Sequence, residues 1–341
     1  MRNVNWTMSK MLSSICRSGF FVALRRKIAK FRQKYDLCYR LRLVESKLDI
    51  LENNLYYEMG ISRSEVPKVM GLEETLEYII KTGCSLCRYG DGEFELVAGC
   101  DMSFEAANPT MQRRLIEILQ NPIPNCLCCI PNVFGSLARY TSDERRCWRH
   151  AAVWMRPLVE KYLSAEYKRG VSQDMVLGDA LISRAYLGGA DKAVAQKIFS
   201  LWKKVWEGQD ILIVEGRFSR LGIGNDLFSS AKSIRRIWCP AVHAFEKYGT
   251  ISETIKNEAK NGDLILLALG ATATILAYDL AKVGYRALDV GHIDVEYMWM
   301  QMGATSKIAI PGRYVNEVKN GHEMRAVDGE EEANNVVAII D

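Results

Sequence analysis

Two carboxylates one residue apart are the clearest sign of chemistry in this chain. They are Asp91 and Glu93, in the stretch Arg88-Tyr89-Gly90-Asp91-Gly92-Glu93-Phe94. Carboxylate oxygens are the ligands that Mg²⁺ and Mn²⁺ prefer, and these ions leave coordination positions for phosphate. Gly90 and Gly92 can take positive φ and let the backbone approach a ligand closely. The spacing predicts a metal and nucleotide site, although a tight turn with solvated acids fits the same short stretch.

The elements around this acidic pair place it at the end of a strand. An apolar run, Cys84 to Cys87, predicts a buried strand, and a helix over Leu72 to Lys81 with Gly83 as its stop delivers the chain into it. An apolar pattern resumes at Phe94 to Val97. In α/β proteins, ligands gather beyond the carboxyl ends of parallel strands, so this is a plausible place for a site.

Short apolar runs alternate with longer helical patterns along the rest of the chain, which predicts an α/β fold with a Rossmann-like, mostly parallel sheet flanked by helices. We expect helices over 111–120, from Ser142 past Trp154 with a break or kink at Arg156-Pro157, after Val214, and over 243–260 and 272–282. We expect strands at 125–130, 211–214, 236–239, 264–269 and 285–290.

The first of these later strands is followed by a polar loop. Glu215 ends the strand, and Arg217 and Arg220 offer forked donors for a diphosphate. Asn225 or Asp226 could cap a following helix or hold a ribose or sugar hydroxyl. We therefore expect this loop to contribute to binding of a diphosphate and its attached ribose or sugar.

Two further strand ends carry candidate site residues. Gly270 and Thr272 open a helix directly after a strand, which suits a phosphate or a uracil edge but also fits an ordinary strand-to-helix turn. His292 and Asp294 are candidates for the general base or for support of the metal. The Gly222-Ile223-Gly224 segment lacks the third glycine of a dinucleotide fingerprint, so NAD binding is rejected.

The acidic stretch, together with four later motifs, resembles the GT-D glycosyltransferases, a bacterial family first described as a domain of unknown function. The later motifs are Val214-Glu215-Gly216, Ser219-Arg220-Leu221-Gly222, Gly224-Asn225-Asp226-Leu227-Phe228 and Gly291-His292-Ile293-Asp294. The resemblance covers residues 65 to 315. It implies that Asp91 and Glu93 are the Asp-x-Glu pair that binds the metal and the nucleotide-sugar donor, and it adds Arg184, in a Ser-Arg segment, as a donor-side residue.

What this resemblance implies is a metal-dependent glycosyltransferase that uses Mn²⁺ or Mg²⁺. It would move a sugar from a nucleotide sugar, most simply a UDP-sugar, to a glycan, lipid-linked or protein-linked acceptor in bacterial surface glycan synthesis. Two alternatives stay open: a metal-dependent nucleotide hydrolase or phosphotransferase, and a non-catalytic, membrane-attached nucleotide-binding scaffold.

Charge is distributed unevenly along the 341 residues. The formal net charge is +4, yet residues 1–50 hold 12 Lys and Arg against 3 Asp and Glu, so the remainder is mildly acidic. This favours an anionic membrane surface as the partner of residues 1–35, rather than nucleic acid. The apolar stretch Met11 to Leu24 is too short for a transmembrane helix. We expect a basic helical arm over residues 1–60, a catalytic domain over 61–341, and a cytoplasmic protein that is peripheral at the inner face of the membrane.

Within this arm, six apolar residues alternate spacings of four and three, as in a coiled-coil heptad. They are Leu37, Leu41, Val44, Leu48, Leu51 and Leu55. Residues Arg40 and Lys47 would face Glu45 and Glu52 across a parallel pair, which predicts a homodimer through residues 37–55. The same leucine stripe could instead pack against the body of its own chain.

The ten cysteines are scattered without a repeated spacing, so we expect no disulfides. Cys84 and Cys87, with Cys126, Cys128 and Cys129, invite a zinc site. Residues three apart on a strand point to opposite faces, however, which favours small core residues.

Overall fold

The structure is a computed structural model. It describes residues 67–102, 105–165, 167, 176–313, 315, 318 and 335–341, together with residues 27, 44, 47, 48, 51, 54, 55 and 57. The chain divides into two compact units, Met1–Glu58 and Met59–Asp341. Among the described residues, the helices lack the length and apolar character that crossing a membrane requires.

In the first unit, the described positions are helical. Four of them belong to the predicted heptad seam: Val44, Leu48, Leu51 and Leu55 are 51%, 57%, 63% and 61% exposed. The rest of the seam, and all of the predicted membrane segment 1–35 except Lys27, lie outside the described residues.

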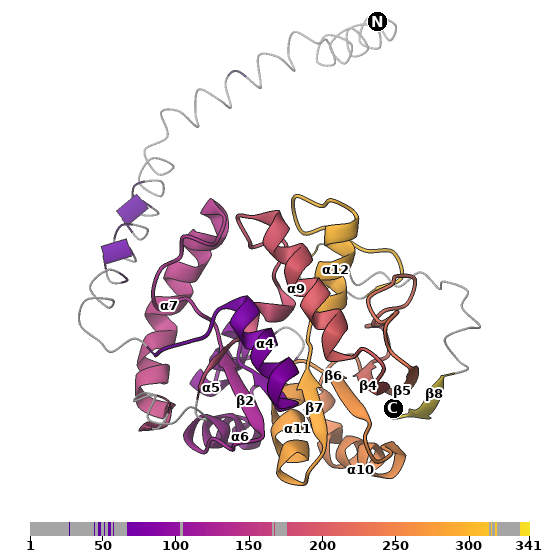
Figure 1. The fold of residues 1–341 in the computed structure, drawn as a ribbon. Helices are drawn as coiled ribbons and strands as arrows, with labels where there is room; N and C mark the ends of the chain where they lie inside the picture. The colour runs from indigo at the N-terminus through magenta and orange to yellow at the C-terminus, as the bar shows by residue number, and fades with distance from the viewer. Residues whose placement is uncertain are drawn as a thin grey trace, which may run out of the picture. The chain divides into compact units, whose positions relative to one another are not determined.

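The second unit is built on an eight-stranded sheet in the order β3-β2-β1-β7-β6-β4-β5-β8 (Figure 1). Every pair of neighbouring strands is parallel. The strands are β1 (Ser85–Arg88), β2 (Cys126–Ile130), β3 (Gly178–Asp179), β4 (Asp210–Gly216), β5 (Ser233–Cys239), β6 (Leu264–Ala268), β7 (Arg286–Asp289) and β8 (Val336–Ile339). The predicted α/β class with a mostly parallel sheet is confirmed.

Helices connect the strands on both faces of this sheet. They are α4 (Leu72–Thr82), α5 (Asp91–Ala98), α6 (Pro109–Gln120), α7 (Ser142–Tyr162), α9 (Lys192–Val205), α10 (Tyr248–Glu258), α11 (Ala271–Lys282) and α12 (Ile293–Gln301), with short 3-10 turns η1 (Ala180–Ser183) and η2 (Ala244–Lys247). On one face, α4, α9 and α12 share a continuous apolar core with alternate residues of the strands, such as Ile211 and Ile213. Helix α11 lies against β1 and β7 and buries ten of its twelve residues.

Local sequence signals account for several helix boundaries. Asn108 caps α6 by accepting hydrogen bonds from Thr110 N and Met111 N, and Pro109 occupies the first turn, where its missing N–H costs nothing. Pro157 lies inside α7, which continues past it as one helix, so of the predicted break or kink at Arg156-Pro157 the break does not occur. Residues buried on both sides of the proline, Met155 and Val159, hold the helix against the core and offset the lost hydrogen bond.

Two predicted elements differ from the structure. The chain after β4, residues 217–232, forms successive turns rather than a helix. The single helix expected from His243 to Lys260 is the 3-10 turn η2 followed by α10. His243 has a positive φ of 53°, outside the right-handed helical region, so no helix includes this residue.

The buried cysteines agree with the prediction from strand geometry. Cys84 packs in the core that α4 and α9 share, whereas the thiol of Cys87 is hydrogen-bonded to those of Cys126 and Cys128 on the other face. The described cysteines are all free thiols. Among the described residues, no group of three or more His, Cys, Asp or Glu side chains is arranged to hold a metal ion.

The strand order brings distant parts of the chain together. Strand β1 lies between β2, the next strand along the chain, and β7, which comes about two hundred residues later. The connections leaving β1 and β7 therefore diverge, and the carboxyl ends of these two strands form the topological switch point at which ligands of open parallel sheets bind.

Candidate functional site

A cleft of about 550 Å³ opens along the carboxyl edge of the sheet, centred on the β1/β7 switch point. Its central part is lined by the β1–α5 turn and by the segment after β7. One side is lined by residues that follow β4, β5 and β6, and the other by α7 and the η1 region. The charged residues of the lining are Arg88, Asp91, Glu93, Glu95, Glu105, Glu144, Arg184, Asp289, Glu296 and Lys307.

The acidic pair lies in the first turn of α5, at the mouth of this cleft. Asp91 is exposed, and the carboxylate of Glu93 turns back so that Oε2 accepts a hydrogen bond from Gly90 N at 2.7 Å. Acidic side chains are stabilised there because the first turn of a helix carries the positive end of its dipole. The two carboxylates are therefore presented from a fixed helix terminus.

The predicted reason for the two glycines in this turn is wrong. Gly90 has a φ of −93°, and neither it nor Gly92 is among the residues with positive φ. A Cβ atom at Gly92 would lie 2.1 Å from Cε of Met102, so the flexible end of the Met102 side chain would have to shift. The chain enters helix α5 at Asp91, where a turn with glycines of positive φ was expected.

Arg88 organises the switch point. Its Nε donates to Asp289 O at 2.7 Å, its Nη2 to Asp289 Oδ1 at 2.8 Å, and its Nη1 to Ser183 Oγ at 2.7 Å and Ala180 O at 3.1 Å. The guanidinium thus joins β1, β7 and η1. Gly291 has no side chain because a Cβ atom would lie 2.0 Å from Nη2 of Arg88.

The electrostatic environment of Glu93 is unfavourable for a bare carboxylate. Burial, and then the neighbouring Asp289 carboxylate, raise the pKa of Glu93 from 4.5 to about 7, although the Gly90 N–H and Arg88 act in the opposite direction. Burial likewise raises the pKa of Asp289. A cation beside Glu93 would remove this penalty.

The donor set of the cleft is compatible with one hard divalent cation. Seven carboxylates line the cleft, against the permanently charged groups of Arg88, Arg184 and Lys307. Asp91 and Glu93 are two oxygen donors at one helix end, and an ion held by one or two carboxylates completes its shell with water and phosphate oxygens. The residues present therefore fit the metal that the Asp-x-Glu pair implies.

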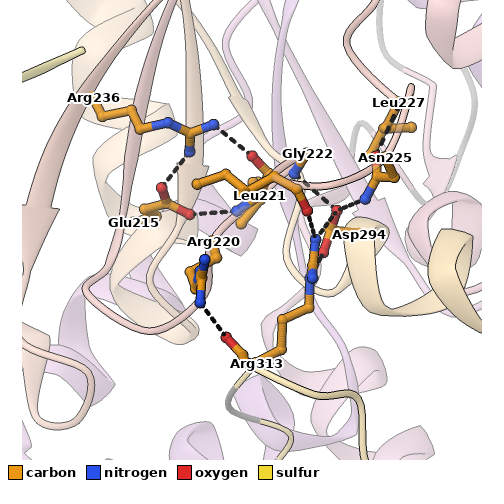
Figure 2. A network of polar contacts seen from close by, with 11 residues as sticks. Glu215, Arg220, Leu221, Gly222, Asn225, Leu227, Arg236, Asp294 and Arg313 are labelled. Carbon is orange, nitrogen blue, oxygen red and sulfur yellow. Dashed lines mark hydrogen bonds and ion pairs between the residues drawn. The ribbon is translucent and has the colours of Figure 1, made fainter. Parts of the chain in front are cut away.

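Figure 2 shows how the loop after β4 is held. Glu215 is fully buried, pairs with Arg236 and accepts a hydrogen bond from Leu221 N at 2.8 Å. Asp294, 2% exposed, accepts from Gly222 N at 2.8 Å and from Asn225 Nδ2 at 2.7 Å.

Asp294 also pairs with Arg313, and Arg220 Nη1 donates to Gly312 O at 3.3 Å (Figure 2). Four residues predicted for the donor site, Glu215, Arg220, Asn225 and Asp294, are not among those that line the cleft. The carboxylates of Glu215 and Asp294 and the amide of Asn225 therefore shape the loop, and the donors that hold Asp294 leave it poorly placed to accept a proton.

Two other residues expected at the donor site lie on the outer surface of the loop. Asp226 pairs with Lys203 at 2.6 Å and accepts hydrogen bonds from Tyr297 Oη at 2.7 Å and Gln301 Nε2 at 2.9 Å. Arg217 is exposed, and its guanidinium carbon lies 5.8 Å from the centre of the Trp238 ring. Neither lines the cleft.

Three of the remaining predicted residues do reach the cleft. Gly270, with a φ of 55°, lies at the start of α11, His292 at the start of α12, and Arg184 directly after η1. Thr272 is completely buried, with Oγ1 3.4 Å from Glu105 Oε2. The cleft thus gathers Arg88, Gly90, Asp91, Gly92, Glu93, Arg184, Gly270 and His292 from the predicted set.

The structure adds cleft residues that the sequence did not reveal. Glu105 lies within 3.9 Å of His243 Nδ1, and burial raises the pKa of its carboxyl group. Glu296 accepts hydrogen bonds from Tyr186 N at 2.9 Å and Leu187 N at 3.0 Å. Glu105 lies in a loop without periodicity, so its sequence surroundings carried no signal.

Comparisons with known proteins agree with this geometry. The family described as glycosyltransferase GT-D fold matches residues 86–318. A probable glycosyl transferase of Streptococcus gordonii is 37% identical over 76% of this chain, and the glycosyltransferase GlyD of Streptococcus pneumoniae serotype 4 is 36% identical over 81% of it. The aligned parts amount to 37% and 33% of those two proteins, so this chain spans about a third of their length.

Solved structures share the fold over their whole length. A structure described as a new glycosyltransferase from Streptococcus sanguinis superposes with a TM-score of 0.75 at 35% identity, covering 81% of this chain and 100% of the other. Another, described as a highly conserved domain with a distinct glycosyltransferase fold, gives a TM-score of 0.74 at 35% identity and covers 84% and 100%. From its matched residues, its parallel sheet and the acidic helix terminus at its switch point, the chain belongs to the glycosyltransferase GT-D fold family.

Proposed function

We propose that the cleft binds a nucleotide sugar, with UDP as its nucleotide, together with Mn²⁺ or Mg²⁺, and transfers the sugar to a hydroxyl group of an acceptor. The observation that carries this proposal is the excess of carboxylates in the cleft lining. A diphosphate enters such an acidic cleft only with a compensating cation. Asp91 and Glu93 would hold that cation at the switch point.

The side of the cleft formed after β4, β5 and β6 suits the diphosphate and nucleoside. Gly270 presents backbone without a side chain directly before α11, where the positive end of the helix dipole favours phosphate. Gly216 and Ala241 lie on the same side and leave room for a flat base or ribose.

In the reaction, the acceptor hydroxyl oxygen forms a bond to the anomeric carbon of the donor sugar. The bond from that carbon to the diphosphate oxygen breaks, and UDP leaves with the bonding electrons. A divalent ion, when bound, neutralises charge that develops on the leaving diphosphate. His292, at the start of α12 in the cleft, takes the acceptor proton.

The acceptor is a hydroxyl-bearing glycan, free, lipid-linked or protein-linked, and the process is bacterial surface glycan synthesis. The names of the two streptococcal relatives support sugar transfer as the reaction class. Since this chain corresponds to about a third of each relative, further domains of those proteins do not enter the proposal.

Consumption of UDP-glucose and UDP-galactose tests the metal requirement. We expect turnover, by transfer or by slow hydrolysis, to stop on addition of EDTA, to return with Mn²⁺, and to fall by roughly a hundredfold or more in Asp91→Asn. Asp143→Asn is the matched control because its exposed carboxylate lies outside the cleft lining. Metal-independent turnover that Asp91→Asn leaves intact would overturn the proposal.

We also propose that residues 37–55 pair two copies of the chain. Support comes from the exposure of Val44, Leu48, Leu51 and Leu55, which are helical and share the predicted seam. Light scattering should give the mass of a dimer for the full chain and of a monomer for Leu48→Asp with Leu51→Asp. A monomeric wild type at micromolar concentration would reject this pairing.

For localisation, we propose that the protein attaches peripherally to the cytoplasmic face of an anionic membrane. The basic character of residues 1–35 supports this proposal. The full chain should float with vesicles that contain phosphatidylglycerol, and a chain starting at residue 36 should not. Equal flotation of both chains, or of neither, would remove this proposal.

A further inference from the structure

Helix α7 presents a one-sided stripe to the cleft, on the opposite side from Gly270 and the β4–β6 strand ends. Glu144, Cys147, Trp148 and Ala151 all line the cleft, and their spacing of three, one and three residues places them on a single helix face. Trp148 and Glu144 are half-buried, and Cys147 is exposed. Further along α7, Ala152, Met155 and Val159 continue the same side of the helix into the core.

The indole of Trp148 is held by a chain of contacts that leads to the sheet. Its ring centre lies 6.2 Å from that of Tyr140, and the Arg139 guanidinium carbon lies 4.7 Å from the centre of the Tyr140 ring. Arg139 in turn pairs with the fully buried Asp179 at the end of β3. The orientation of the aromatic pair is therefore tied to the sheet.

The loop facing this stripe is also held closely. Gly188 accepts a hydrogen bond from Thr141 N at 3.0 Å, and a Cβ atom at Gly188 would lie 3.4 Å from Glu144 Cγ. Arg139 O accepts from Ala190 N at 2.9 Å. Glu144 and Trp148 therefore form one wall whose shape is set before any ligand arrives.

The chemistry of this wall suits a neutral sugar ring. A pyranose has an apolar face of C–H groups, which stacks on an aromatic ring, and an edge of hydroxyls, which donate to a carboxylate. The stripe offers the indole of Trp148 for the first and Glu144 for the second. Its four residues include no basic group, so the stripe does not suit a phosphate.

The position of the wall assigns the sugar to the acceptor. Along the sheet edge, the acidic pair at β1 lies between the β4–β6 side and the β2–β3 side from which α7 departs. With the diphosphate between the acidic pair and Gly270, and the nucleoside on the β4–β6 side, the α7 wall faces the remaining side. We propose that Trp148 and Glu144 form the acceptor-sugar subsite, a proposal that rests on the proposed donor site.

Binding of simple glycosides tests this subsite directly. The probes are methyl β-D-glucopyranoside and methyl N-acetyl-β-D-glucosaminide, added to the full chain with UDP and Mg²⁺ and followed by saturation-transfer NMR. We expect at least one probe to bind, with the strongest transfer to ring C–H protons. In Trp148→Ala its affinity should fall roughly tenfold or more, and in Glu144→Gln it should fall with the transfer pattern unchanged.

Trp154→Ala is the matched control, because Trp154 is a half-buried tryptophan of the same helix outside the cleft lining. Calorimetric titration of UDP into the same samples separates the two proposals. UDP affinity unchanged in Trp148→Ala, with glycoside binding lost, supports the acceptor subsite. If glycoside binding depends on Trp148 but UDP does not bind, the sugar subsite is supported and the proposed donor site is rejected.

Three outcomes would overturn the subsite. The first is that neither glycoside binds the wild-type chain. The second is that Trp148→Ala binds the glycosides as tightly as the wild type does. In the third, Trp148→Ala weakens UDP or UDP-glucose while glycoside binding persists, which would make the wall part of the donor site.

Discussion

At the scale of single residues, the acidic groups of this protein have two different roles. Asp294 and Glu215 are buried and each is satisfied by backbone N–H groups and an arginine. Asp91 is exposed at the cleft, and Glu93 has a pKa raised to about 7 by burial and by Asp289. The carboxylates of Asp294 and Glu215 hold the loop in shape, whereas a bound cation would stabilise the acidic pair at Asp91 and Glu93.

The neighbours His292 and Asp294 should separate stability from catalysis. Asp294→Ala leaves the buried Arg313 without its carboxylate, so we expect the free energy of unfolding to fall by about 3–5 kcal/mol. His292→Ala should leave the melting temperature within about 2 °C of wild type and lower kcat by roughly a hundredfold or more. Thermal unfolding and turnover of the two variants check this, and the reverse pattern would restore Asp294 as the base.

Asp226 should affect acid stability and not activity. Its hydrogen bonds from Lys203 and Tyr297 lower the pKa of Asp226 from 3.8 to about 2. The ionised form is stabilised by folding, so its contribution is complete above pH 3.8 and disappears as the pH falls through about 2. Asp226→Asn should cost no more than about 1 kcal/mol at pH 6, because the pair is largely exposed, and clearly less at pH 2, where only part of the Asp226 carboxylate is still ionised in the folded protein.

Urea unfolding of Asp226→Asn and wild type at the two pH values measures this difference. Sugar-donor turnover at pH 7 should be the same in both proteins. A deficit as large at pH 2 as at pH 6, or a loss of donor binding, would show that Asp226 acts in some other way.

At the scale of elements, the turn between β7 and α12 depends on one glycine. Gly291 has a φ of 47°, and a Cβ atom there would displace the guanidinium of Arg88 from Asp289. Gly291→Ala should therefore cost about 3 kcal/mol or more and reduce turnover, since both backbone strain and a broken buried pair contribute.

Gly284→Ala is the control for backbone strain alone. Its φ is 90°, and nothing lies within 4 Å of an added Cβ atom. We expect it to cost about 1–2 kcal/mol without an effect on turnover. Equal losses in the two variants, measured by denaturant unfolding, would mean that the Arg88 contact contributes nothing.

Periodic segments of the sequence predicted their own structure well, whereas irregular ones did not. Strand β6 and helix α11 follow directly from an apolar run and the helical pattern after it. The sequence predicted a helix after Val214, but Glu215 and Asp294 accept hydrogen bonds from Leu221 N and Gly222 N and hold residues 217–232 as turns. Such tertiary hydrogen bonds leave no trace in local periodicity.

The candidate site was predictable only in part for a related reason. Asp91 and Glu93 stood out by type and spacing, and the strand ends located Gly270 and His292. Trp148 and Glu144 lie on a half-exposed helix face. Its sequence pattern is the same whether the face borders solvent or a cleft, and only the fold shows that it borders the cleft. The sequence also assigned Asp226 to the donor, because an acid near a strand end looks the same whether it faces the cleft or Lys203.

At the scale of the whole molecule, the strand order makes the site. Pairing β1 with β7 brings Arg88 to Asp289, about two hundred residues later, and places the acidic helix terminus between two differently lined sides of one cleft. The local periodicity of the sequence does not predict that β1 pairs with β7. Carboxylates outnumber basic groups in the resulting cleft, so we expect binding of the proposed anionic donor to be linked to binding of a cation.

Calorimetric titration of UDP with and without Mn²⁺, into wild type and into Asp91→Asn with Glu93→Gln, tests this linkage most directly. We expect UDP to bind the wild type at least roughly a hundredfold more tightly with Mn²⁺, and the double variant to lose that gain. Because both substitutions preserve side-chain size, their melting temperatures should stay close to wild type. UDP binding of equal strength with and without Mn²⁺, unchanged by the two substitutions, would contradict a metal-linked donor site at the end of β1.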